Sequence, residues 1–155
     1  MPDDQSSAAE IGAKPTFFKM RAQLLDDGRS NTPLADTENM WSRLKVYASG
    51  GENTLHAHPN EDHMFVVLDG SACFYGPGGE ERVLTRNEGL MLPAGSFYSF
   101  QATSDEPLVL LRVGCCVNDR EDHGKRIAVG GGPLPGKSKA NKWKAPVYRD
   151  GAYYE

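Results

Sequence analysis

The stretch TLHAHPNEDHMFVVLD, residues 54–69, contains three of the four histidines of the chain. TLHAH and HMFVVLD have the composition of β-strands, and PNED between them favours a turn. Alternate side chains of a strand point to the same face, so His56 and His58 would lie on one face. The turn would bring His63 back beside them. The stretch therefore predicts two strands joined by a turn, with three imidazoles gathered where they meet.

The same pattern of short apolar runs separated by turns continues on both sides of this stretch. From Ser42 onward, short runs rich in Val, Leu, Tyr and Phe are separated by turn residues. Further strands are expected at SRLKVYA, SACFYG, ERVL, LMLP, FYSFQA and PLVLLRVG. Many short strands with such regular turns predict an all-β domain, either a sandwich or a jelly-roll β-barrel.

The two ends of the chain differ from this middle part. Residues 1–38 are polar and interrupted by Gly and Pro, with one helix-compatible piece at FFKMRAQLL. Residues 119–155 are charged, then rich in Gly and Pro, and end in the aromatic APVYRDGAYYE. We therefore expect an N-terminal arm (1–38), a β-barrel (39–118) and a C-terminal arm (119–155), whose tyrosines would pack on the barrel or on a partner subunit.

Composition limits the classes of function. With 155 residues, 39% of them hydrophobic and 25% charged, the chain fits one globular domain. A formal net charge of −4 and a pI near 5.6 give no basic field for nucleic acid. No apolar run approaches the roughly 20 residues of a membrane span, and the polar, acidic start is unlike a signal peptide. We expect a cytoplasmic protein whose three cysteines are reduced.

The histidine cluster predicts a metal site. Neutral imidazoles suit Zn, Cu, Fe and Ni, and paired strands hold ligands rigidly. The alternative is a set of unrelated polar histidines near a turn. Glu61 and Asp62 are candidates to orient an imidazole from outside the ligand set.

These residues resemble the cupin superfamily over approximately residues 41–113. Its first motif is Gly, five residues, His-x-His, three or four residues, Glu, six residues, Gly. The residues in register with it are Gly50, His56, His58 and Gly70, with His63 in the Glu position. The second motif is Gly, five residues, Pro-x-Gly, two residues, His, three residues, Asn. Its positions are filled here by Asn87, Pro93, Gly95, Tyr98 and Ala102.

The resemblance implies a jelly-roll barrel that holds a divalent transition metal through His56, His58 and His63. Iron is the first expectation for the metal, with Zn, Mn and Ni as alternatives. Without the usual Glu, the ion would keep more positive charge and act as a stronger Lewis acid. Asp62 would fit the Glu position only with the three-residue spacing, which makes the gap to Gly70 one residue too long.

The function expected from this resemblance is a dioxygenase acting on a small organic acid or diketone. A non-redox isomerase or lyase is one alternative, and a barrel that binds a sugar or small molecule without turnover is another. Cupins often pair through their sheets, so a homodimer is expected. The expected partner is otherwise a small-molecule substrate, with no nucleic acid and no membrane.

Tyr98 has three interpretations that the sequence leaves open. It is a phenolate ligand, a general acid or base beside the metal, or a core aromatic residue. Arg112 is expected to pair with a surface acid, with a place facing the barrel mouth as the alternative. Cys73 is expected to be a small buried side chain, and His123 a solvated residue.

Overall fold

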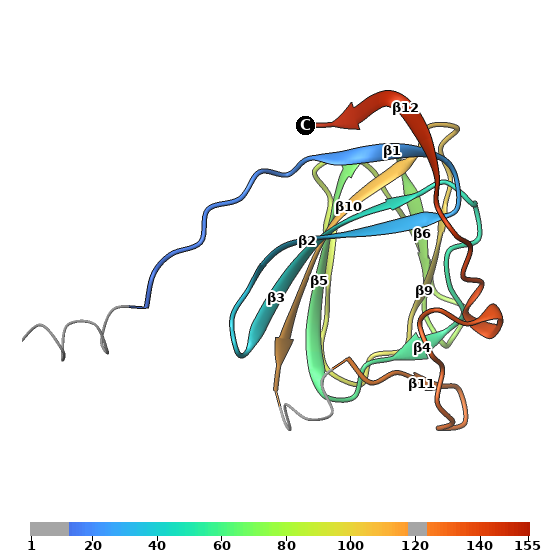
Figure 1. The fold of residues 1–155 in the computed structure, drawn as a ribbon. Helices are drawn as coiled ribbons and strands as arrows, with labels where there is room; N and C mark the ends of the chain where they lie inside the picture. The colour runs from blue at the N-terminus through green and yellow to red at the C-terminus, as the bar shows by residue number, and fades with distance from the viewer. Residues whose placement is uncertain (1–12, 118–123) are drawn as a thin grey trace, which may run out of the picture.

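A computed structural model describes residues 13–117 and 124–155 of the chain (Figure 1). His123 therefore lies outside the described residues. The described part is built of strands, with one short 3₁₀ helix at Lys139–Asn141. The strands are β1 (Ala22–Asp27), β2 (Arg29–Asp36), β3 (Met40–Tyr47), β4 (His56–Ala57), β5 (Glu61–Asp69), β6 (Ala72–Tyr75), β7 (Glu81–Leu84), β8 (Gly89–Leu92), β9 (Ser99–Ala102), β10 (Leu108–Cys116), β11 (Ile127–Ala128) and β12 (Val147–Tyr154). The predicted all-β fold is confirmed.

Two sheets enclose the main core. One has five strands in the order β2-β3-β10-β5-β8, and the other has three in the order β7-β6-β9. Both the β3–β10 and the β10–β5 pairs are antiparallel. Buried residues of both sheets meet between them, as they do in a jelly roll. This core contains Tyr47, Phe65, Val67, Ala72, Phe74, Leu84, Leu92, Tyr98, Phe100, Leu108 and Leu110.

The outer face of the five-stranded sheet has a separate apolar cluster. Leu44, Val46 and Val109 pack there with Ala22 and Leu25 of β1. Strand β1 pairs in turn with β12, and this two-stranded sheet packs its β1 residues against this face (Figure 1). Side chains from neighbouring positions of one strand thus enter two different cores, as strand alternation requires.

Two strands lie within the stretch expected to be the N-terminal arm (1–38). Strand β2 is an edge strand of the large sheet, and the expected boundary at residue 39 falls between it and its partner β3. The prediction of a helix-compatible piece at FFKMRAQLL is wrong, because that segment is extended and enters β1 at Ala22. Pairing with β12, far away in sequence, outweighs its local helix preference.

The C-terminal segment also returns to the sheets. Strand β11 pairs with β4, beside the first histidine, and β12 pairs with β1. Gly28, in the turn between β1 and β2, has φ +77°, and a Cβ there would lie 1.9 Å from the carbonyl oxygen of Ala145. Glycine is required at this position both by the left-handed backbone and by the close approach of the C-terminal segment.

Candidate metal centre

The three predicted histidines come together at one end of the barrel. His56 begins β4, His58 follows it, and His63 lies near the start of β5. The Nε2 atoms of His56 and His58 are 3.2 Å apart, and the rings of His58 and His63 have centroids 4.1 Å apart. All three side chains are buried. The predicted clustering across the PNED turn is therefore present.

The backbone around the histidines follows the motif even where its residues differ. Tyr98 lies opposite His56 in an antiparallel bridge, and the two exchange both backbone hydrogen bonds, at 3.0 and 2.9 Å. Asn87, in the first glycine position of the second motif, has φ +69°. Asparagine is one of the few residues with a side chain that adopts this left-handed conformation readily. The substitution therefore preserves the turn before β8.

The histidines have the chemical state that a metal needs. Burial lowers the pKa of His56 to about 3 and also lowers the pKa values of His58 and His63. The rings are therefore neutral near pH 7. His56 Nδ1 lies 2.6 Å from the carbonyl oxygen of Thr54, which accepts its proton and leaves the lone pair on Nε2.

The spacing of the donor atoms also suits a metal. Two ligand nitrogens of a tetrahedral zinc site lie roughly 3.3 Å apart, given metal–nitrogen distances of about 2.0–2.1 Å. The 3.2 Å between the Nε2 atoms of His56 and His58 is close to that value. His63 Nε2 is also buried, and no hydrogen-bond partner for it lies in the described part of the chain. The site therefore has a further ring nitrogen that the described residues do not satisfy.

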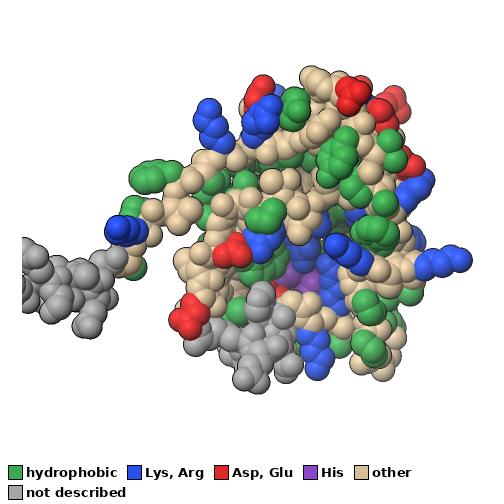
Figure 2. Space-filling view, in the orientation of Figure 1, with side chains coloured by type: hydrophobic (Ala, Val, Ile, Leu, Met, Phe, Trp, Pro, Cys, Tyr) green, Lys and Arg blue, Asp and Glu red, His purple; other side chains and the backbone are tan. Residues whose placement is uncertain are grey.

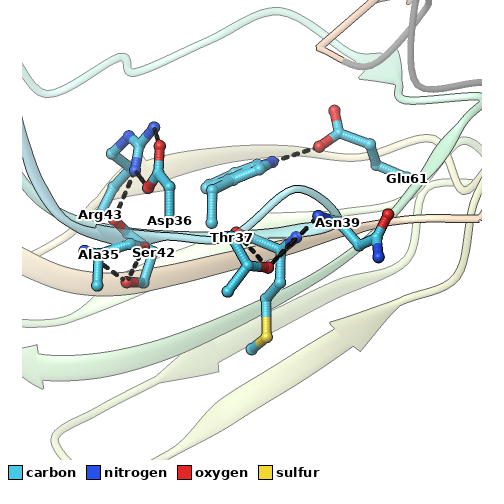
Figure 3. Close-up of polar contacts among 9 residues, drawn as sticks. Ala35, Asp36, Thr37, Asn39, Ser42, Arg43 and Glu61 are labelled. Atoms are coloured by element: carbon cyan, nitrogen blue, oxygen red, sulfur yellow. Dashed lines mark hydrogen bonds and ion pairs between the residues drawn. The ribbon is translucent and has the colours of Figure 1, made fainter. Parts of the chain in front are cut away.

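Glu61 joins this cluster. Ligand atoms of His58, Glu61 and His63 all lie within 4.8 Å of one another, a group in which Glu61 stands where the sequence predicts His56. The indole of Trp41 donates to its carboxylate (Figure 3). The backbone N–H of Gly124 donates to the same carboxylate. Burial opposes its ionisation, but His63, Trp41 and Gly124 outweigh burial and lower its pKa to about 2. Glu61 is an anion at neutral pH.

The sequence predicts Glu61 only as a residue that orients an imidazole from outside the ligand set. Strand alternation, however, also predicts that it lies on the same face as His63. Glu61 and His63 are two residues apart on β5 and therefore share a face. Asp62, the other candidate, points elsewhere, because its Oδ1 accepts a hydrogen bond of 2.8 Å from the backbone of Ala94. It fixes the Pro-Ala-Gly turn rather than joining the donor group.

Tyr98 is both a core residue and part of the site. Its ring belongs to the main core, and its hydroxyl lies 3.3 Å from His58 Nε2. Burial raises the pKa of Tyr98, so the side chain is a neutral phenol. Of the three interpretations of Tyr98, the surroundings support the core aromatic residue and favour a phenol over a phenolate.

The prediction that Arg112 pairs with a surface acid is wrong. The side chain is only 8% exposed, and its Nη2 lies 3.4 Å from His58 Nε2 and 3.3 Å from His63 Nδ1. Pairing of β10 with β5 places Arg112 opposite Phe65, on the inner face of the sheet. The alternative, an arginine that faces the barrel mouth, is what the structure shows.

The site opens to the surface through a recess. A cavity of about 200 Å³ is lined by His58 and Glu61, together with Trp41, Arg112 and Arg126. Figure 2 shows the histidine atoms at the bottom of this recess, with lysine and arginine side chains around it. Ligands therefore reach the imidazoles past basic groups.

The fold and the motif residues identify the family. The sequence pattern described as "Cupin domain" matches residues 43–114, the stretch that contains both motifs. Residues 43–114 are a cupin domain. Within the described residues, no helix is long and apolar enough to cross a membrane.

Several known proteins are similar to this cupin domain. The uncharacterized protein YdbB of Bacillus subtilis (strain 168) is 29% identical over 77 residues, which cover 50% of this chain and 66% of YdbB, just under two thirds. KdgF from Halomonas sp. superposes with a TM-score of 0.57 at 19% identity, over 70% of this chain and 99% of that one. A conserved double-stranded β-helix protein from Klebsiella pneumoniae gives 0.57 at 14% identity, over 68% of this chain and 100% of its own. At these identities the solved structures show the fold alone.

Proposed function

We propose that this cupin domain is a metal-dependent enzyme acting on a small organic acid. The observation that carries the proposal is the group of buried donors at the recess, namely His58, Glu61 and His63 with the Nε2 atom of His56 beside them. Neutral imidazoles and one carboxylate suit Fe, Zn and related divalent ions. Glu61 also supplies the negative charge that the His63 substitution takes away from the family motif.

The donor types support oxygenase chemistry as the first reaction class. Two histidines and one carboxylate are the ligand set of non-haem iron(II) oxygenases. Bound iron would supply redox chemistry with oxygen, or act as a Lewis acid on a carbonyl group. The protein's own part is to orient an acidic substrate through Arg112 and to exclude water with the rings of Trp41 and Phe65, over which the guanidinium lies.

Tyr98 supports a second candidate, a non-redox isomerase or lyase. A buried phenol 3.3 Å from His58 Nε2 is placed to give a proton to a substrate held in the recess. This chemistry needs a group that carries a proton near pH 7 and no change of metal oxidation state. Burial raises the pKa of Tyr98, which keeps its phenol protonated.

Metal content tests the proposal most directly. Protein purified without a His-tag or chelator should contain a transition metal equimolar with its subunits, measured by plasma mass spectrometry. His58→Ala and Glu61→Gln should lower metal affinity by about tenfold or more. Asp62→Asn is the matched control, because it changes a neighbouring carboxylate that lies outside the donor group. Wild-type protein that stays metal-free after reconstitution would overturn the proposal.

Oxygen uptake then separates the two reaction classes. Iron-loaded protein that consumes oxygen with diketones or small organic acids is a dioxygenase. Turnover with zinc or manganese and no oxygen uptake identifies an isomerase or lyase, and Tyr98→Phe should then reduce kcat far more than KM. Metal binding without turnover of any such compound would contradict the enzyme proposal and leave a binding protein.

A further inference from the structure

A second cavity lies between the large sheet and the returning C-terminal segment. Its volume is about 360 Å³, at the lower end of the range for small-molecule sites. Five of the residues that line it are basic, and none of the described residues around it is Asp or Glu. The basic residues are Arg29, Lys45, Arg112, Arg126 and Lys137.

One of these cations has a structural role. Arg29 donates to the backbone carbonyls of Glu52, Gly136 and Asn141, and so ties the C-terminal segment to the start of β2. The carbonyl groups satisfy its donors without neutralising its charge. Arg29 therefore builds one wall of the cavity and adds to its positive potential.

Lys45 and Arg126 have no such partners. Within residues 13–117 and 124–155, neither side chain makes a hydrogen bond or an ion pair to a carboxylate. Arg112 is buried, and its Nε has no partner in the same part of the chain. The neighbouring Arg43 differs, because it pairs with Asp36 (Figure 3). The cavity thus gathers cations that make no ion pair within the described residues, while Glu61, which lines the recess with Arg112 and Arg126, accepts hydrogen bonds from Trp41 and Gly124 instead.

The basic side chains of this cavity repel one another. Burial, followed by the charges of Arg112 and Arg126, lowers the pKa of Lys45 well below its usual range. Burial and Arg112 likewise lower the pKa of Arg126. Because uncompensated charges close together in a partly buried cluster are unfavourable, a cluster of this kind is expected where an anion completes it.

We propose that this cavity binds a small organic dianion, held by Lys45, Arg112 and Arg126. Two negative charges match the unpaired cations better than one. Tyr47, Phe65 and Phe100 also line the cavity and offer an apolar surface to the carbon skeleton of the ligand. Net negative charge on the protein as a whole does not oppose binding, because the local field in a cleft of one sign dominates.

The position of the arginines links this cavity to the candidate metal centre. Arg112 and Arg126 line both this cavity and the recess that contains His58 and Glu61. Tyr98 lines the anion cavity and points its hydroxyl at His58. A dianion held here would present one end to the metal side. Its role as substrate rests on the proposed function, whereas the binding site itself does not.

Thermal shift and calorimetric titration test the site with defined probes. Succinate and glutarate represent dicarboxylates, glycerol phosphate represents phosphate monoesters, and acetate and chloride at matched ionic strength are the references. Dianions should raise Tm and bind at least about tenfold more tightly than acetate. Whichever class binds more tightly, dicarboxylate or phosphate monoester, identifies the anionic group that the cavity prefers. Equal shifts with dianions and with chloride would overturn the proposal.

Variants separate binding from a structural role. Lys45→Met and Arg126→Gln should each weaken dianion binding by about tenfold, while the free protein becomes no less stable because an unpaired cation is removed. Arg86→Gln, a change of the same charge at an exposed site, is the matched control. Variants that bind dianions as tightly as Arg86→Gln would contradict the assignment. If Lys45→Met does not fold, Arg126→Gln alone decides.

The test is run on both metal-loaded and chelator-treated protein. Dianion binding that persists without metal supports the cavity even if the metal proposal fails. Metal binding without dianion binding would overturn the cavity proposal and leave the metal centre standing. The two proposals therefore fail in distinguishable ways.

Discussion

The two faces of the five-stranded sheet are built from the same strands but are composed very differently. On the outer face, Leu44, Val46 and Val109 pack in an entirely apolar cluster under β1. On the inner face, the same strands place Lys45 and Arg112 at the cavity, and Arg112 also lies beside His58. The outer face follows the ordinary rule of apolar burial, whereas the inner face breaks it at one end. Such local violations are expected where a fold carries a function.

The largest expected effect comes from breaking the outer face. Leu44 is fully buried, and Leu44→Ala should lower the free energy of unfolding by about 2–5 kcal/mol, through lost burial and the cavity left behind. Chemical denaturation of both proteins measures the change. Metal content per folded subunit should be unaltered. Loss of metal from the folded variant would contradict the view that the outer face contributes to stability while the inner face holds the metal.

Lowering the pH should destabilise the protein through the buried histidines and Glu61 of the inner face. The folded pKa values of the histidines lie below their unfolded value, near 6.5, so the unfolded chain binds more protons as pH falls. For chelator-treated protein, stability should therefore be highest above pH 6.5 and fall as pH decreases toward about 3, the pKa of His56. Glu61 extends the loss further, because its stabilisation disappears as pH falls toward about 2.

Denaturation at several pH values measures this slope. His56→Gln should make it shallower between pH 6 and 4, because one proton-binding group of the unfolded chain is removed. Leu44→Ala should leave the slope unchanged while lowering stability at every pH. Parallel curves for wild type and His56→Gln would contradict a buried neutral imidazole at this position.

The turn that joins the outer layer to the sheet gives a smaller effect. Gly28→Ala would place a methyl group against the backbone of Ala145 and force a residue with a side chain into positive φ. The expected loss is about 1–3 kcal/mol. Gly79→Ala is the control, since Gly79 also has positive φ but no atom within 4 Å of its built Cβ. If both variants lose equally, the close approach of the C-terminal segment contributes nothing.

The contrast between the faces also explains what the sequence could and could not predict. Alternation and turns around residues 54–69 were enough to predict the strands and to gather His56, His58 and His63. The same alternation also places Glu61 on the face of His63, although the sequence analysis expects Glu61 outside the ligand set. Strand β1 could not be predicted from local sequence, because it pairs with β12, which is more than 100 residues away in the chain.

Arg112 illustrates the same limit at the site. Its neighbours His58, His63 and Trp41 come from other strands and are fixed only by the register of β10. Nothing within PLVLLRVG says that its arginine faces inward among imidazoles. The pairing register between strands far apart in sequence therefore determines the position of Arg112, which the local sequence pattern does not predict. The homodimer, which depends on surfaces between chains, stays a prediction.

The smallest effect on stability is expected at this same arginine, which should not show the loss expected for Leu44→Ala. Arg112→Met keeps an apolar stem but removes a buried cation, so the free energy of unfolding should stay within about 1 kcal/mol of wild type or rise. Dianion binding should nevertheless be lost in titration calorimetry. A loss of stability as large as that of Leu44→Ala would mean that the contacts of Arg112 with His58 and His63 hold the barrel together. The inner face would then be a structural network rather than a site kept at the expense of stability.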